Sequence, residues 1–133
     1  MTALDAAVAQ ARDTGNRQLV AEALAARADV LDRRGDAPHA RATAREALSL
    51  ARETQDHRLV LIARLASGTA EASVPELEAV ADQAAASRLL PLVAPARLAL
   101  ARVHLDAGRA PRARDAALAA VAAAEPLGQR DYE

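Results

Sequence analysis

The residues best suited to acid–base or metal chemistry are three histidines, His39, His57 and His104. His39 and His57 lie near the expected N-termini of helices, where solvated polar side chains are common. None of the three has a second histidine or a carboxylate at a recognised metal-ligand spacing. Cysteine is absent, which excludes a disulfide and a thiolate metal site. We therefore expect no metal and no cofactor.

The remaining polar residues do not suggest a catalytic site. His104 has the apolar neighbours Leu100, Val103 and Leu105, so we interpret it as a partly buried histidine that fills a packing gap. No serine lies in a Gly-x-Ser-x-Gly elbow, and the glycines are scattered singly rather than gathered in a phosphate-binding loop. Catalysis needs a preorganised set of titratable groups. The sequence therefore predicts a protein that is not an enzyme.

The charge balance argues against nucleic acid and membrane partners. Seventeen arginines, with no lysine, stand against 18 acidic residues, so the net charge is −1 and gives no general attraction to polyanions. Arg41, Arg45 and Arg52 could form a stripe for phosphates or acidic peptides. However, Glu46 and Glu53 are interleaved with them, and we interpret the stripe as a solvated outer face.

Hydropathy and composition indicate the setting of the protein. No apolar run is long enough to span a bilayer. Asp5 and Arg12 interrupt the N-terminal stretch, which is unlike a signal peptide. The lysine-free composition, rich in alanine and arginine, resembles that of bacteria with GC-rich genomes. We expect a cytoplasmic bacterial protein.

Composition and periodicity both predict helices. Alanine fills 39 positions, and alanine, leucine, arginine and glutamate are strong helix formers. Single glycines and the cap residues Asn16, Asp36, Asp56 and Ser73 divide the chain. The predicted helices span residues 3–14, 17–34, 37–54, 57–71, 74–87, 91–107 and 110–124.

The sixth helix has an ambiguous start, because Pro91 and Pro95 both lie there. Proline fits the first turn of a helix but disrupts its interior. We therefore expect the regular helix to begin between Val93 and Pro95.

Two spacings recur along the chain. The segment from Ala7 to Thr14 matches the segment from Ala47 to Thr54, at an offset of 40 residues. The segment Gly35-Asp36-Ala37-Pro38 recurs at an offset of 73 as Gly108-Arg109-Ala110-Pro111. Because glycine, proline and apolar positions share this register, we interpret it as an internal repeat of helical hairpins.

The stretch from Ala21 to Arg52 resembles a tetratricopeptide repeat (TPR), a pair of antiparallel helices with small residues where they cross. Ala28 takes the small position, Leu31 the large apolar position and Gly35 the turn. The matching positions of the second helix are Ala40, Ala44 and Ala47. A later unit matches with Ala101, Gly108, Ala113, Ala117 and Ala120, and a degenerate middle unit with Gly68, Leu77, Ala81 and Ala84.

The chain also departs from the family pattern. The family's aromatic residues are missing, His104 replaces a large apolar residue, and Arg27 occupies an apolar position. The 40-residue spacing exceeds the family's period of about 34. It is more similar to the longer TPR-type repeats of large bacterial transcription regulators.

The resemblance implies an all-α fold, a right-handed solenoid of antiparallel helical hairpins with about seven helices. We expect one TPR-like repeat domain over 1–133, forming a segment of a longer array. Its parts are a second helix of a preceding repeat (1–15), a repeat (16–55), a degenerate repeat (56–88), a repeat (89–127) and the start of a following repeat (128–133). Such hairpins bury little alone and depend on stacking.

The resemblance also implies a function. We expect a protein–protein interaction scaffold, or a regulatory arm of a larger bacterial signalling or transcription protein, that binds a peptide or protein segment in a concave groove. The predicted groove residues are Glu22, Asp29, Asp32, Arg33, Ile62, Leu65, Leu98, Arg102 and Leu105. One alternative is an arm that senses a small molecule or peptide. Another is self-assembly into a homo-oligomer through end helices around Leu4, Val8 and Val121.

Overall fold

The computed structural model describes the backbone of residues 3–130 and the side chains of residues 3–125. Over that range the chain forms seven α-helices and no strand, as the sequence predicts. The helices are α1 (Ala3–Thr14), α2 (Arg17–Arg33), α3 (Ala37–Thr54), α4 (His57–Ala70), α5 (Val74–Ala86), α6 (Leu90–Asp106) and α7 (Ala110–Arg130). None of the described helices combines the length and the apolar character needed to cross a bilayer.

Side-chain caps fix where four helices begin. Asn16, Asp36, Asp56 and Ser73 each precede a helix and accept a hydrogen bond from the backbone N–H three residues on, at 3.2, 3.4, 3.1 and 3.4 Å. These bonds satisfy donors that the first turn of a helix leaves without a partner. The four N-caps predicted from the sequence are confirmed.

The start of α6 corrects one prediction. The helix begins at Leu90, with Pro91 in its first turn and Pro95 inside it, rather than between Val93 and Pro95. Pro95 has no N–H to donate to the carbonyl of Pro91, one turn earlier. Both prolines are exposed, so this carbonyl lies on the solvent side, where water can hydrogen-bond to it.

The end of α7 corrects another. The sequence predicts an end at Ala124 and the start of a following repeat at Gly128, but the helix continues to Arg130. A glycine inside a helix costs only about 1 kcal/mol relative to alanine, so it does not by itself end one. Residues 131–133, the rest of the predicted repeat start, lie outside the described residues.

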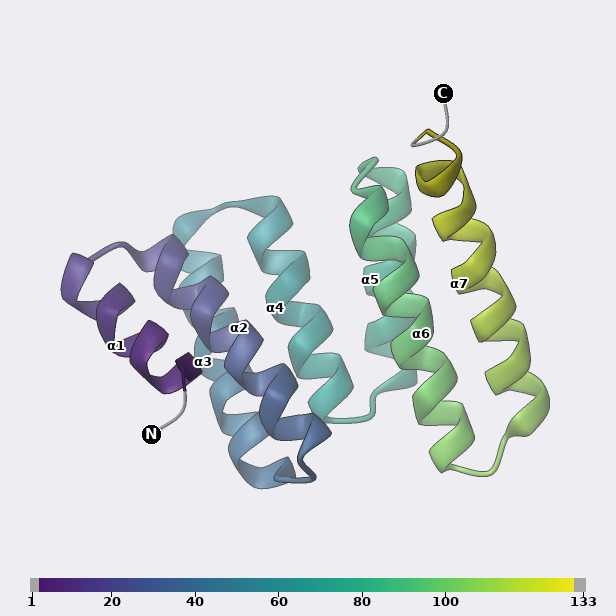
Figure 1. Cartoon of the computed structure of the whole chain (residues 1–133), viewed down its shortest axis with the longest axis horizontal. Coiled ribbons are helices and arrows are strands. Elements are labelled where there is room, and N and C mark those ends of the chain that lie inside the picture. The colour runs from purple at the N-terminus through teal and green to yellow at the C-terminus, as the bar shows by residue number, and fades with distance from the viewer. Residues whose placement is uncertain (1–2, 131–133) are drawn as a thin grey trace. The chain divides into compact units, whose positions relative to one another are not determined.

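The chain divides into two compact units, residues 1–71 and 72–133. In the first unit consecutive helices run antiparallel (Figure 1). Helices α2, α3 and α4 pack against one another, and α1 packs against α2. The core draws on all four helices and consists of Val8, Ala11, Val20, Ala21, Leu24, Ala25, Ala47, Ala51, Leu59 and Ala63. Alanine predominates, and its small side chain lets helix axes approach toward the short end of the usual range of about 8–10 Å.

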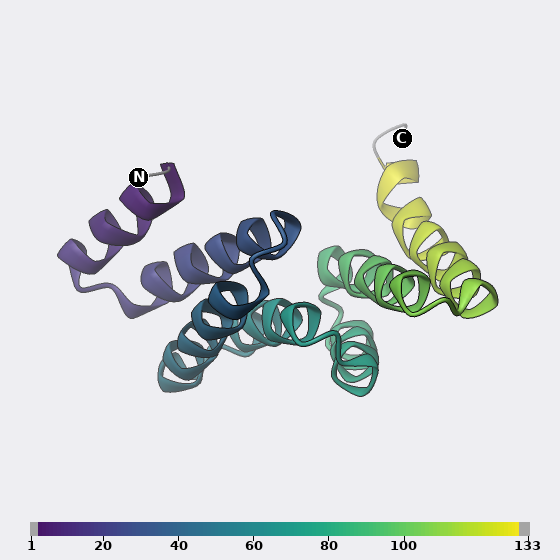
Figure 2. The ribbon, with the colours of Figure 1, turned by 90° about the horizontal axis from the view of Figure 1, so that it is seen from below.

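In the second unit α6 lies between α5 and α7 and contacts both (Figure 2). The buried side chains described in this unit are Leu77, Val80, Ala81, Ala84, Val93, Ala96, Leu100, His104, Ala113 and Ala120. The boundary after Glu71 falls inside the predicted repeat over 56–88, which contributes α4 to one unit and α5 to the other. The packing of that repeat as a hairpin, and the single domain over 1–133, stay predictions.

The turn before α2 has the same hydrogen bonds as the turn before α4, 40 residues later. The hydroxyls of Thr14 and Thr54 each donate to the carbonyl three residues earlier, both at 2.6 Å. The same hydroxyls accept from the N–H of the cap residue, at 3.2 and 3.3 Å. Gly15 and Gln55 complete the two turns in the left-handed conformation, with φ of 70° and 58°.

The 73-residue spacing relates α1–α3 to α5–α7. The bounds of α2 and α6 lie 73 residues apart at both ends. Gly35 and Gly108 follow these helices with φ of 81° and 78°. The next backbone N–H then closes each turn onto the carbonyl of Leu31 or His104, at 2.9 and 2.8 Å. Both spacings seen in the sequence therefore recur in the hydrogen bonding of the turns.

The small residues expected at helix crossings are not equally buried. Ala28 is 1% exposed and Gly68 is buried, as the prediction requires. Ala101 is only half-buried. The face of α6 that carries Ala101 is therefore less covered than the matching face of α2.

Candidate functional site

The predicted groove residues of the first unit lie on two helices that pack against each other, α2 and α4. They are Glu22, Asp29, Asp32, Arg33, Ile62 and Leu65. On each helix they follow at helical spacing and so share one side. Ile62 and Leu65 are half-buried, and Ile62 packs against the core of the unit. The surface thus combines charged side chains on α2 with partly exposed aliphatic side chains on α4.

Glu22 and Asp29 on this face of α2 form ion pairs with arginines. Glu22 Oε1 lies 3.4 Å from Arg58 Nη1 and links α2 to α4. Asp29 Oδ2 lies 3.1 Å from Arg33 Nη2, one turn along the helix. The four side chains are roughly half exposed or more, so solvent screens each pair, which contributes about 1 kcal/mol at most. Arginines therefore partly neutralise the acidic residues Glu22 and Asp29 of the predicted groove.

The other predicted groove residues, Leu98, Arg102 and Leu105, lie on α6 in the second unit. They form one exposed stripe, in which Leu98 is 54% and Leu105 63% exposed. Large exposed aliphatic side chains are typical of an interaction surface. The structure thus groups the predicted residues into two sets, one on α2 and α4 and one on α6.

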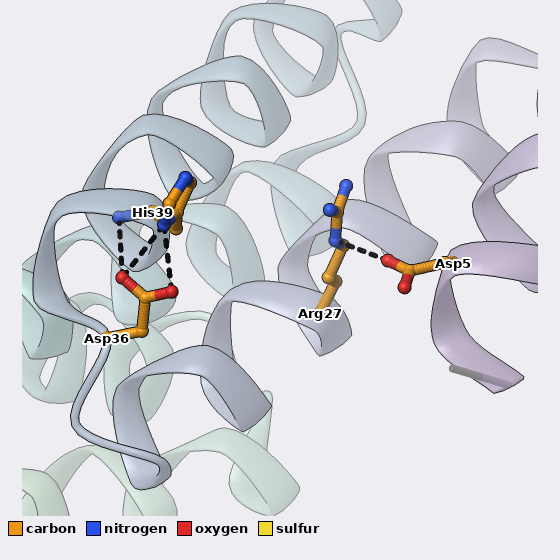
Figure 3. Close-up of polar contacts among 4 residues, drawn as sticks. All are labelled: Asp5, Arg27, Asp36 and His39. Atoms are coloured by element: carbon orange, nitrogen blue, oxygen red, sulfur yellow. Dashed lines mark hydrogen bonds and ion pairs between the residues drawn. The ribbon is translucent and has the colours of Figure 1, made fainter. Parts of the chain in front are cut away.

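Two of the three histidines are exposed, and one of these caps a helix together with an aspartate. His39 Nδ1 lies 2.8 Å from Asp36 Oδ2, the carboxylate that also accepts the His39 backbone N–H (Figure 3). The hydrogen bond from the His39 ring lowers the pKa of the Asp36 carboxyl, and the His39 backbone N–H and ring charge act in the same direction. Over the residues that the structure describes, no group of three or more His, Asp or Glu side chains is placed to hold a metal ion.

His104 is buried on α6, with 7% of its surface exposed. Its Nδ1 accepts a hydrogen bond from Arg109 Nε at 2.9 Å, so the neutral ring carries its proton on Nε2. The neighbours of His104 in the sequence predict its burial. They do not predict its hydrogen bond with Arg109 across the turn.

The second unit contains a cleft of about 450 Å³ that the sequence analysis did not predict. Ten residues of α5, α6 and α7 line it: Val74, Glu78, Asp82, Arg97, Leu100, His104, Arg112, Asp115, Ala116 and Ala119. The lining mixes aliphatic side chains with both signs of charge, and Arg97 Nη2 lies 4.0 Å from Asp82 Oδ1. The volume falls within the range of small-molecule sites, about 300–1,000 Å³.

Two lining positions of this cleft have shorter side chains than their counterparts 73 residues earlier. Leu100 and Ala119 stand where the first unit has Arg27 and Glu46. There Arg27 Nε reaches Asp5 Oδ1 at 2.9 Å, between α2 and α1 (Figure 3), and Glu46 accepts from an arginine of α1 at 2.7 Å. Long paired side chains thus cross the interhelical space of the first unit.

The outer arginines of α3 are solvated and mixed with acidic partners. Arg41, Arg45 and Arg52 are exposed. Arg45 Nη2 lies 3.1 Å from Glu71 Oε1, and the interleaved Glu46 also forms an ion pair. This arrangement fits the interpretation of a solvated outer face.

Comparisons with known protein families, with curated proteins and with solved structures return no match for this chain. Inference about its function therefore rests on its own repeat geometry and surfaces.

Proposed function

We propose that this chain is a non-catalytic interaction module, a right-handed solenoid of TPR-like hairpins that binds a peptide or protein segment. The observation that carries the proposal is the recurrence of the α2–α3 hairpin as α6–α7 at a spacing of 73 residues, with the same left-handed glycine turn and turn-closing hydrogen bond. Repeated hairpins at constant spacing are typical of solenoid proteins, whose stacked units present extended binding surfaces. A regulatory arm within a larger bacterial protein is the setting that this architecture suits.

The face formed by α2 and α4 is the proposed binding groove. Ile62 and Leu65 supply half-exposed aliphatic surface, and the charged residues of α2 border it. Because Glu22 and Asp29 are already paired with arginines, charge at this border steers and orients a partner more than it adds affinity. The aliphatic side chains are then the residues that hold the partner once it is bound.

Fluorescence anisotropy with labelled peptides that vary in the spacing of leucine and arginine tests this proposal. We expect at least one peptide to bind with a Kd below about 100 μM, roughly −5.5 kcal/mol. The double substitution Asp29→Arg and Asp32→Arg should slow association and weaken its dependence on salt. Leu65→Ala should speed dissociation instead.

The matched control is a charge reversal on the solvated outer face, Arg41→Glu with Arg52→Glu. These exposed residues lie on α3, so the change should leave peptide binding unaltered. If the substitutions on α3 abolish peptide binding while those on α2 and α4 have no effect, the binding site lies at the outer arginines and the proposed groove is wrong. Circular dichroism of each variant shows that it retains its helices.

A second candidate function is the sensing of a small effector, and the cleft of the second unit favours it. Aliphatic residues, His104 and both signs of charge line that cleft, which suits a small zwitterionic ligand such as a dipeptide or amino acid. A thermal-shift screen of amino acids and dipeptides tests this function. The variant Ala119→Glu places in the cleft the glutamate that the first unit has at the matching position. A ligand that raises the melting midpoint of the unaltered chain but not of this variant supports the sensing function. The absence of any such ligand overturns it.

A further inference from the structure

The outer face of α6 and α7 carries aliphatic side chains that no other helix of the second unit covers, over the residues that the structure describes. Leu98 and Leu105 on α6 are more than half exposed, and so is Val121 on α7, at 56%. Ala101 beside them is half-buried. Such a patch of large aliphatic residues at helical spacing is unfavourable in water and marks an interaction surface.

The first unit shows what covers this face, because α2 and α3 hold the matching positions 73 residues earlier. Ala25, the counterpart of Leu98, is only 5% exposed, and Ala28, the counterpart of Ala101, is 1% exposed. On α3, the counterpart of Val121 is Leu48, which is half-buried and packs against the core. The same surface is therefore closed in one unit and open in the other.

The element that closes it in the first unit is a single helix, α4. Helix α4 contacts both α2 and α3 and runs parallel to α2 and antiparallel to α3 (Figure 1). Its side chains Leu59 and Ala63, one turn apart, join Ala25 of α2 and Ala51 of α3 in one core cluster. The counterpart of Ala51 is Ala124, which is exposed.

We infer that the α6–α7 face is a docking site for one amphipathic helix of a protein partner, seated as α4 is seated on α2 and α3. The docked helix runs parallel to α6 and antiparallel to α7. It presents aliphatic residues one turn apart, and a small residue opposite Leu98, because this leucine takes the place of an alanine and fills more of the space. The site lies in the second unit, so it does not depend on the groove of α2 and α4.

A second copy of the chain is a different occupant, and the template of the first unit disfavours it. A two-fold pair would set one α6–α7 face against another, two helices on two. In the first unit a single helix occupies the matching face. The mass of the chain in solution distinguishes these occupants.

Two helix-stabilised peptides serve as probes in a fluorescence anisotropy titration of the full chain. The first carries residues 56–71 of this sequence, which include α4 with its N-cap Asp56. The second has alanine in place of Leu59, to make room for Leu98. We expect at least one probe to bind with 1:1 stoichiometry, and Leu98→Glu and Val121→Glu each to weaken this binding at least about tenfold.

The matched control is Leu118→Glu, one turn from Val121 on α7 and similarly exposed. Its counterpart on α3 is Arg45, which remains exposed although α4 is docked beside it. Leu118→Glu should therefore change binding by less than about twofold. All three substituted positions are exposed, so the variants keep the fold, as circular dichroism verifies.

Three results overturn the inference. One is that neither probe binds below about 1 mM. Another is that Leu118→Glu weakens binding as much as Val121→Glu. The third is that light scattering shows a dimer that Leu98→Glu and Val121→Glu dissociate, which assigns the face to a second copy. If no peptide binds to α2 and α4 but a probe still binds to the α6–α7 face, this inference stands and only the proposed groove is overturned.

Discussion

Helices α1–α3 and α5–α7 have similar turns but different side chains between the helices. Both segments place three antiparallel helices in the same order, with left-handed turns at matching positions. In the first segment Arg27 pairs with Asp5 between helices, whereas the counterparts Leu100 and Glu78 line a cleft. Left-handed turns at matching positions mark the repeat, whereas the side chains between the helices differ from one segment to the other.

The largest expected difference concerns a small residue that is buried on α2 and half-buried at the matching position of α6. Ala28→Leu should lower the free energy of unfolding by about 1–3 kcal/mol, because a buried site has no room for the added side chain. Ala101→Leu should cost clearly less, since Ala101 is half-buried. Urea denaturation followed by circular dichroism measures both. Equal costs would mean that the two positions are packed alike and would contradict the difference in their burial.

Much of this fold could be predicted because it depends on local signals. Seven helices and the caps at Asn16 and Ser73 follow from periodicity and from side chains that bond to nearby N–H groups. The predicted start of α6 was wrong because Pro95 was expected in a first turn, although a helix tolerates an interior proline at a local cost. The predicted end of α7 at Ala124 was wrong because the helix continues through Gly128 to Arg130.

Less of the candidate site could be predicted, because it depends on contacts between distant segments. The groove residues were assigned by family position, which gives a face but not the partner of each charge, such as Arg58 for Glu22. The cleft is lined by residues of three helices, such as Glu78, His104 and Ala119, that lie far apart in the sequence. A pattern within one helix carries no information on such contacts.

The turn before the central helix gives the next test of the comparison. Gly15 occupies a left-handed position with nothing within 4 Å of an added Cβ, so Gly15→Ala should cost about 1 kcal/mol through backbone conformation alone. Arg88 holds the matching position with φ of 61°. Arg88→Gly should therefore raise stability by about 0.5–1 kcal/mol, after the added chain entropy of glycine is subtracted. Thermal melts in which both variants lose stability would contradict the proposed equivalence.

A smaller effect is expected from the ion pair that only the first segment has. Arg27→Ala should lower stability by about 0.2–1 kcal/mol, because the pair with Asp5 is partly exposed. The loss should shrink in 1 M NaCl, where the Debye length is about 3 Å. The matched change in the second segment, Leu100→Ala, should show no dependence on salt. Denaturation at two salt concentrations separates the two.

The smallest expected effect is a pH dependence at the cap of α3. The lowered pKa of Asp36 means that its ionised form is favoured by folding. Its contribution is present above the usual carboxyl pKa, about 3.9, and is lost as pH falls through the lowered value. Asp36→Asn keeps a cap side chain and should remove this part of the acid sensitivity. The counterpart of Asp36 is Arg109, which has no carboxylate, so the second segment should not lose stability in this way as the pH falls.

The turn-closing hydrogen bonds have a consequence for the exchange of amide protons with solvent. The N–H groups of Asp36, Leu89 and Arg109 lie in surface turns, yet each is bonded to a carbonyl five residues earlier, at 2.9, 2.9 and 2.8 Å. Exchange at these amides requires the last turn of the preceding helix to open. Three protected protons in otherwise fast-exchanging loops therefore report the fraying of α2, α5 and α6 one helix at a time.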